Sequence, residues 1–140
     1  MFQTLDEAVS FIRHKSVAMV DLKFCDLWGR WRHVTLPAGR FNPSLIESGV
    51  GFDGSSLGLT AVKSGDLVLV PELGTAFLDP FWEAPTISFL CATLEADTRH
   101  PFPHDPRTLA ARAEEFLRTS GVGDASLWGP EFEFYLFDGV

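Results

Sequence analysis

The sequence predicts an α+β fold: one small domain, ending near residue 98, with a mixed or antiparallel sheet and short helices. A helical pattern comes first, followed by a hairpin pattern, a short helix and several strand patterns. A proline-rich stretch, residues 99–106, separates this set from one last helix and one last strand. The hydrophobic content of 46% and the charged content of 21% over 140 residues indicate a packed globule rather than a disordered chain.

The first elements follow from local patterns. Thr4 and Glu7 have the spacing of a capping box, and apolar residues then recur at helical intervals, which predicts a helix over 5–14. Alternating apolar residues predict a half-buried strand over 18–25, and a turn at 26–29 leads to a returning strand over 30–36. Asn42 and Pro43 predict the start of a short helix that runs through Ile46.

The predictions for the later elements depend more on glycine and proline residues, which mark where helices, strands and loops begin and end. Residues 49–56 are too glycine-rich for the interior of an element, so we expect a loop there. Strands are predicted over 66–71, 75–78 and 86–94. Asp105 and Pro106 suit the N-cap and first position of a helix that ends near Gly121. An apolar strand over 126–137 follows, and we expect it to open a further, truncated domain.

Charge and hydropathy exclude several kinds of partner. The net charge of −8 argues against nucleic acid and anionic membranes as main partners, because both require a basic patch. The apolar runs are too short to span a bilayer, and the first residues lack the pattern of a secretory signal. Cys25 and Cys91 lie in strand-like segments, and we expect free buried thiols, which fit a reducing cytoplasm.

Glu131 and Glu133 are the first candidate site residues. They lie at i and i+2 in an apolar stretch, so a strand would project both carboxylates from one face. Such a pair requires a counter-charge, either a hard cation such as Mg²⁺ or Mn²⁺ or a nearby arginine. The alternative is an edge strand whose glutamates face water.

Asp53 and Ser56 are the second candidates. The loop Asp53-Gly-Ser-Ser56 presents a carboxylate and two hydroxyls, and its simplest interpretation is a turn. Its functional interpretation is that Asp53 attracts a cationic or amine substrate and accepts its proton, while Ser56 orients it. The glycines do not form a phosphate-binding motif. We expect His100 and His104 to be exposed residues of the proline-rich stretch, and His33 to have a structural role.

These motifs together resemble those of class I glutamine synthetases. The resemblance depends on the loop at 52–56 with the following 65–71, and on Gly129-Pro130-Glu131-x-Glu133-Phe134. The stretches at 20–37 and 104–107 strengthen it. It runs over nearly the whole chain, which corresponds to about the N-terminal third of a family-length protein.

The resemblance implies a β-grasp domain over 1–100 and the beginning of the catalytic domain over 101–140. It implies a cytoplasmic, ATP-dependent glutamate–ammonia ligase that acts through γ-glutamyl phosphate and uses two divalent metals, Mg²⁺ or Mn²⁺. Carried over by motif, Asp53 binds and deprotonates ammonium with Ser56 beside it. Glu131 matches the ligand of the metal nearer the ATP phosphates, and Glu133 the ligand of the metal nearer glutamate.

The resemblance also implies a homo-oligomer, in which the Asp53 loop completes the site of a neighbouring subunit. We expect this chain to be inactive alone, because its motif supplies one carboxylate to each metal, whereas a hard cation needs about six oxygen ligands. One position departs from the family pattern: Thr60 stands where an aromatic residue is usual, in a loop one residue shorter. This departure leaves open a related γ-glutamyl ligase that uses a larger amine. Two further alternatives are a free-standing non-catalytic β-grasp binding module and an unrelated α+β interaction protein.

Overall fold

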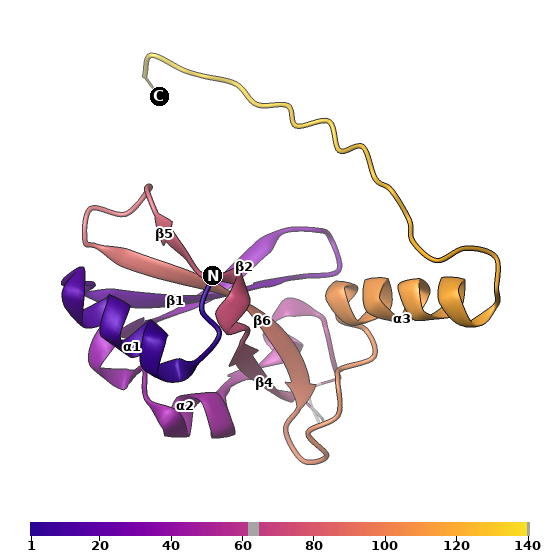
Figure 1. The fold of residues 1–140 in the computed structure, drawn as a ribbon, viewed down its shortest axis with the longest axis horizontal. Helices are drawn as coiled ribbons and strands as arrows, with labels where there is room; N and C mark the ends of the chain where they lie inside the picture. Colours follow the sequence, from indigo (N-terminus) through magenta and orange to yellow (C-terminus); the bar gives the residue numbers. More distant parts are fainter. Residues whose placement is uncertain (62–64, 140) are drawn as a thin grey trace. The chain divides into compact units, whose positions relative to one another are not determined.

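The computed structural model describes residues 1–61 and 65–139, and the chain divides into two compact units, 1–110 and 111–140. The first unit contains a six-stranded mixed sheet with short helices (Figure 1), which confirms the predicted α+β class. In the described part of the chain, no helix has both the length and the apolar character needed to cross a membrane.

The sheet has the order β2-β1-β6-β4-β3, and β5 also pairs with β6. Its strands are β1 (Met19–Cys25), β2 (Trp31–Pro37), β3 (Val50–Asp53), β4 (Asp66–Pro71), β5 (Phe77–Asp79) and β6 (Thr86–Glu95). β1 and β6 run parallel, whereas every other pair is antiparallel. A parallel neighbour for β1 requires a long connection, and the intervening α2, β3 and β4 supply it.

Two helices cover one face of this sheet (Figure 1). α1 (Leu5–His14) has the predicted bounds, since Thr4 accepts a hydrogen bond from the Glu7 N–H at 3.3 Å. α2 (Pro43–Ser48) begins as predicted, with Asn42 as its N-cap, and extends two residues beyond Ile46. The core beneath them is formed by Ala8, Ile12, Val20, Leu22, Phe24, Phe41, Leu45, Ile87 and Phe89. Phe41 stacks on Phe89 with a centroid distance of 4.9 Å.

Two expectations about the middle of the chain are corrected. The glycine-rich segment is not all loop: β3 pairs with β4 through Val50 to Asp53, and only then does a 3₁₀ turn, η2 (Gly54–Leu57), begin. The strand expected over 75–78 is displaced, because Thr75 ends another 3₁₀ turn, η4 (Leu73–Thr75), and β5 begins at Phe77. A third such turn, η1 (Ala38–Arg40), follows β2.

The last helix begins as expected, and the last strand is not formed. α3 (Pro106–Thr119) begins immediately after Asp105, whose carboxylate accepts a hydrogen bond from the Thr108 N–H. Residues 126–137 have an extended trace (Figure 1) but make no strand pairing with any described residue. A strand is defined by its hydrogen-bonded neighbour, and alternation of side chains alone does not provide one.

Candidate functional site

Asp53 lies at the C-terminal end of β3, where the strand passes into η2. The antiparallel pairing of β3 with β4 places it opposite Asp66, and its side chain is exposed. β4 is itself paired with β6 on its other side. The carboxylate is thus carried at the end of an ordered ladder and not on a long free loop.

The environment of the Asp53 carboxylate is specific. Its Oδ1 accepts hydrogen bonds from the Ser55 N–H at 2.9 Å and from the Ser55 hydroxyl at 2.7 Å. The hydrogen bond from the Ser55 hydroxyl has the largest effect on the pKa of Asp53, and the bond from the Ser55 N–H has the next largest. Together they hold this pKa below its ordinary value of 3.8. Asp53 is therefore an ionised, exposed carboxylate at neutral pH, as capture of a cation requires.

The structure separates the roles of the two serines. The predicted site residue Ser56 does adjoin Asp53, but its hydroxyl donates to the Asp53 backbone carbonyl at 2.7 Å. Ser55, which the sequence analysis did not select, makes the contacts to the carboxylate. The only signal in the sequence was the pair of consecutive serines after Asp-Gly. This pair does not indicate which hydroxyl donates a hydrogen bond to the Asp53 carboxylate.

Two glycines hold the loop close to the sheet. The Gly54 N–H donates to the Gly65 carbonyl at 2.7 Å, and a Cβ on Gly54 would lie 2.6 Å from Leu67 Cδ1. A Cβ on Gly65 would lie 2.6 Å from Asp53 Oδ1. Glycine at both positions therefore permits the close backbone approach that sets the position of the carboxylate.

A second polar cluster joins β1, β2 and β5. Asp21 is buried, and its Oδ1 accepts from the Thr35 hydroxyl at 2.6 Å and lies 2.7 Å from His33 Nδ1. Lys23 Nζ lies 2.6 Å from Asp79 Oδ2 and 3.6 Å from Asp21 Oδ2. Because these carboxylates already have counter-charges and donors, we assign the cluster a structural role, which agrees with the expectation for His33.

Glu131 and Glu133 are both exposed, in the segment that forms no strand. Within residues 1–61 and 65–139, no three His, Cys, Asp or Glu side chains form a group that could hold a metal ion. Two carboxylates are too few for a hard cation, which takes about six oxygen ligands. The described residues thus do not build a metal centre by themselves, and the role of the two glutamates stays a prediction.

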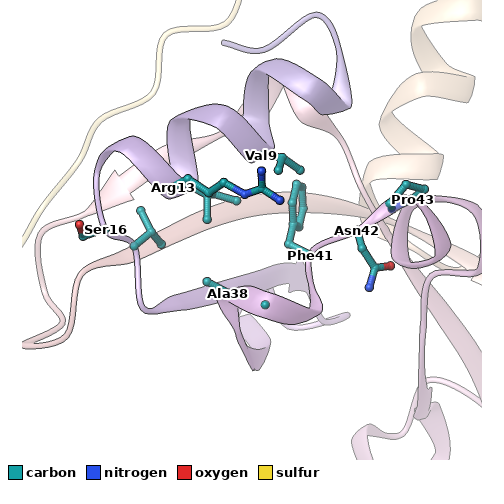
Figure 2. A pocket seen from close by; sticks show the side chains of 10 residues that line it. Val9, Arg13, Ser16, Ala38, Phe41, Asn42 and Pro43 are labelled. Carbon is teal, nitrogen blue, oxygen red and sulfur yellow. The ribbon is translucent and has the colours of Figure 1, made fainter.

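A separate cavity of about 530 Å³ lies between α1 and the segment from Ala38 to Pro43 (Figure 2). Arg13 and Asn42 line it together with apolar side chains such as Phe41. None of the predicted site residues lines this cavity, and its lining contains no carboxylate that could accept a proton. The Asp53 loop therefore remains the candidate site.

Comparisons with a family model, with curated relatives and with solved structures all find similarity to glutamine synthetases. Residues 16–96 match the family model of the glutamine synthetase β-grasp domain. The whole chain is 39% identical to a 3-hydroxylaminophenol mutase of Cupriavidus pinatubonensis, and 97% of it is 40% identical to a glutamine synthetase of Azotobacter vinelandii. A cryo-EM structure of a Plasmodium falciparum glutamine synthetase has the same fold over 86% of this chain, with a TM-score of 0.74 and 20% identity.

The share of each relative that is covered is small. The chain spans 30% of the length of the mutase, 29% of the Azotobacter protein and 23% of the Plasmodium chain. The relatives thus contain a large region to which nothing in these 140 residues corresponds.

Proposed function

The chain belongs to the glutamine synthetase family, and we propose that it is the N-terminal portion of an ATP-dependent glutamate–ammonia ligase. In this proposal residues 1–100 are the β-grasp domain, and residues 101–140 begin the catalytic domain. The full-length protein would act on glutamate, ammonia and ATP.

The observation that carries the proposal is the state of Asp53. Its carboxylate is exposed and ionised, and both hydrogen bonds to its Oδ1 come from Ser55. Ammonium must be held by a negative charge and must lose a proton before its nitrogen can attack an acyl phosphate. An exposed carboxylate at the end of an ordered strand suits both steps, and the adjoining Ser56 is proposed to help bind the acceptor.

The remaining parts of the site are proposed to come from the glutamate motif at 131–133 and from a longer chain. Glu131 and Glu133 would each supply one carboxylate to one of two Mg²⁺ or Mn²⁺ ions, whose charge offsets that of the transferred phosphoryl group. Other ligands and the nucleotide site would come from the rest of a longer chain. A homo-oligomer, in which the Asp53 loop completes the site of a neighbouring subunit, is part of the proposal.

A second candidate function is γ-glutamylation of a larger amine. Thr60 favours it, because this residue stands where an aromatic residue is usual in the family pattern. A threonine is smaller than an aromatic residue and leaves room for an alkyl group. Comparing methylamine and ammonium as acceptors for the full-length protein distinguishes the two ligases.

A third candidate is a free-standing β-grasp module without catalysis, and ligation of ammonium or methylamine by the wild-type full-length protein separates both ligases from it. The Asp53→Ala variant of the full-length protein then tests the role of Asp53. We expect this variant to lower glutamine formation at least 100-fold, the usual minimum contribution of a general base. ATP- and glutamate-dependent phosphate release without ammonium should persist, because Asp53 acts after phosphorylation. Asp97→Ala is the matched control, since Asp97 is also exposed and also accepts a neighbouring N–H, that of Thr98 at 2.8 Å. Glutamine formation at the normal rate by Asp53→Ala would refute the assignment.

A further inference from the structure

The two oxygens of the Asp53 carboxylate are in different environments. Oδ1 accepts both the N–H and the hydroxyl of Ser55, at 2.9 and 2.7 Å. Among the described residues, no donor is hydrogen-bonded to Oδ2. Oδ1 is therefore the oxygen that the described residues hold.

We propose that Ser55 is a positioning residue for the acceptor amine, because it holds Oδ1 so that Oδ2 receives the ammonium ion and then its proton. This inference rests on the proposed ligase function, and it gives Ser55 a role beside the acceptor-binding role proposed for Ser56. Ser55 does not contact the reacting atoms in this proposal and acts through Asp53 alone.

The hydrogen bond from the Ser55 hydroxyl to Asp53 Oδ1 is not part of an ordinary helix cap. Asp53 is the N-cap of η2, and the Ser55 N–H bond is the usual bond of such a cap. That bond alone leaves the carboxylate able to rotate about its last torsion, which is broad for aspartate. The second bond from the same residue to the same oxygen restricts this rotation.

Gly65 restricts the carboxylate from the other side. Its backbone approaches so closely that a Cβ there would lie 2.6 Å from Asp53 Oδ1 and 3.4 Å from Ser55 Oγ. Oδ1 is thus enclosed between Ser55 and Gly65, and Oδ2 is the oxygen that we propose receives the cation. Restriction of one carboxylate geometry before binding reduces the entropy lost when the small, symmetric ammonium ion is oriented.

The first test measures the carboxylate itself. The titration of the Asp53 side-chain carbon is followed by ¹³C NMR in the 140-residue chain, for wild type, Ser55→Ala and Ser55→Thr. We expect the pKa of Asp53 to rise in Ser55→Ala, because a bond to the charged form is lost, and to stay near the wild-type value in Ser55→Thr, which keeps the hydroxyl. Ser55→Ala removes one surface oxygen, so folding is retained. An unchanged Asp53 pKa in Ser55→Ala would overturn the inference and leave the proposed ligase function intact.

The second test measures the consequence in the full-length protein. Ser55→Ala should raise the KM for ammonium about tenfold, the equivalent of one hydrogen bond to a charged group, with the KM for glutamate unchanged. The acid limb of the pH–rate profile should move to higher pH, and Ser55→Thr should restore both values. Thr98→Ala is the matched control, since Thr98 also donates its hydroxyl to a carboxylate, Glu95 Oε2 at 2.6 Å. Equal increases in both KM values would indicate a general structural defect and overturn the positioning role. Absence of ligase activity in the wild-type protein would instead reject the proposed function, and the inference with it.

Discussion

Lys23 is the cation on which the buried carboxylates of β1 and β5 depend. Its Nζ lies within 4 Å of both Asp21 and Asp79, and its own side chain is 21% exposed. Burial raises the pKa of Asp79, but the hydrogen bonds from Lys23, Phe81 and Ser88 outweigh it, so the pKa lies below the ordinary 3.8. The stability contributed by Asp79 is therefore present above pH 3.8 and is lost as the pH falls through the lowered value.

We expect Lys23→Met to lower the free energy of unfolding by about 2 kcal/mol at pH 7, somewhat less than for a fully buried pair because Lys23 is partly exposed. The deficit should shrink as the pH falls from 3.8 towards the lowered pKa of Asp79, because the stability that the Lys23 pair gives to Asp79 is lost over that range. Urea denaturation at pH 7, 5 and 3 measures both effects. Lys15→Met, a change at an exposed lysine, is the control and should cost less than about 0.5 kcal/mol. A deficit that is equal at pH 7 and pH 3 would show that the loss has no electrostatic origin.

The residues of this cluster illustrate what sequence patterns leave out. Alternation predicted a half-buried strand over 18–25, and Val20, Leu22 and Phe24 lie in the core. Asp21, which lies between two of these residues in the sequence, is fully buried as well. The register of β1 with β2 places Thr35 opposite Asp21 and His33 opposite Lys23, and these partners satisfy the buried charge. Register is a property of the pairing, so the pattern of one strand cannot supply it.

The helices and strands were predictable where their signals are local. α1 has both its cap and its apolar stripe within one stretch, and β4 is a continuous apolar run, so both have the expected bounds. β3 was missed because its partner residues in β4 lie beyond a loop and because Gly49 and Gly51 suggest a turn. Gly49 has φ +71°, and a Cβ there would lie 2.4 Å from Val68 Cγ1, so this glycine marks close packing.

Asp105 provides a test at the start of α3. Its Oδ2 accepts the Thr108 N–H and hydroxyl, both at 3.1 Å, while its Oδ1 is buried without a hydrogen-bond partner among the described residues. Burial raises the pKa of this carboxyl above its ordinary value, despite the bonds from Thr108 and the nearby Arg107. The hydrogen bonds from Thr108 to Asp105 cap α3, but burial of the charged Asp105 carboxylate is unfavourable.

We therefore expect Asp105→Asn to be at least as stable as wild type at pH 7, because asparagine keeps the cap acceptor and removes the buried charge. Asp105→Ala should cost about 1 kcal/mol, since the cap is lost. The folded state binds a proton at Asp105 more tightly than the unfolded state does. The free energy of unfolding of wild type should therefore rise relative to that of the asparagine variant as the pH falls through the raised pKa. Urea denaturation of the three proteins at pH 7 and pH 4 decides this. An asparagine variant as unstable as the alanine variant would show that the carboxylate charge is required.

For the full 140 residues, we expect no ATP- and glutamate-dependent phosphate release. The chain has no phosphate-binding glycine motif, and its glutamate motif supplies one carboxylate to each proposed metal, where about six oxygen ligands are needed. A coupled phosphate assay at micromolar protein with Mg²⁺ or Mn²⁺ makes the measurement, and the full-length protein is the positive control. Measurable release by the purified chain would contradict the expectation and would place a nucleotide site within these residues.

The C-terminal segment tests where cooperative structure ends. No backbone–backbone hydrogen bond joins residues 122–139 to any described residue, and Leu127, Phe132 and Phe134 are 99%, 87% and 77% exposed. β1 and β6, by contrast, are paired on both sides and carry the buried core. Amide exchange follows the free energy of the opening that exposes each N–H, so the two regions should differ by the full stability of the sheet.

Hydrogen exchange of a dilute monomer, read residue by residue, measures this difference. Amides of β1 and β6 should exchange only through global unfolding, and those of 126–137 at nearly the rate of an unstructured chain. An unpaired apolar segment is also a template for pairing with another chain, so protection of 131–137 should appear as the protein concentration rises. Strong protection of this segment at the lowest concentration would show that it is already paired within one chain. The expectation that it belongs to a further domain would then be wrong.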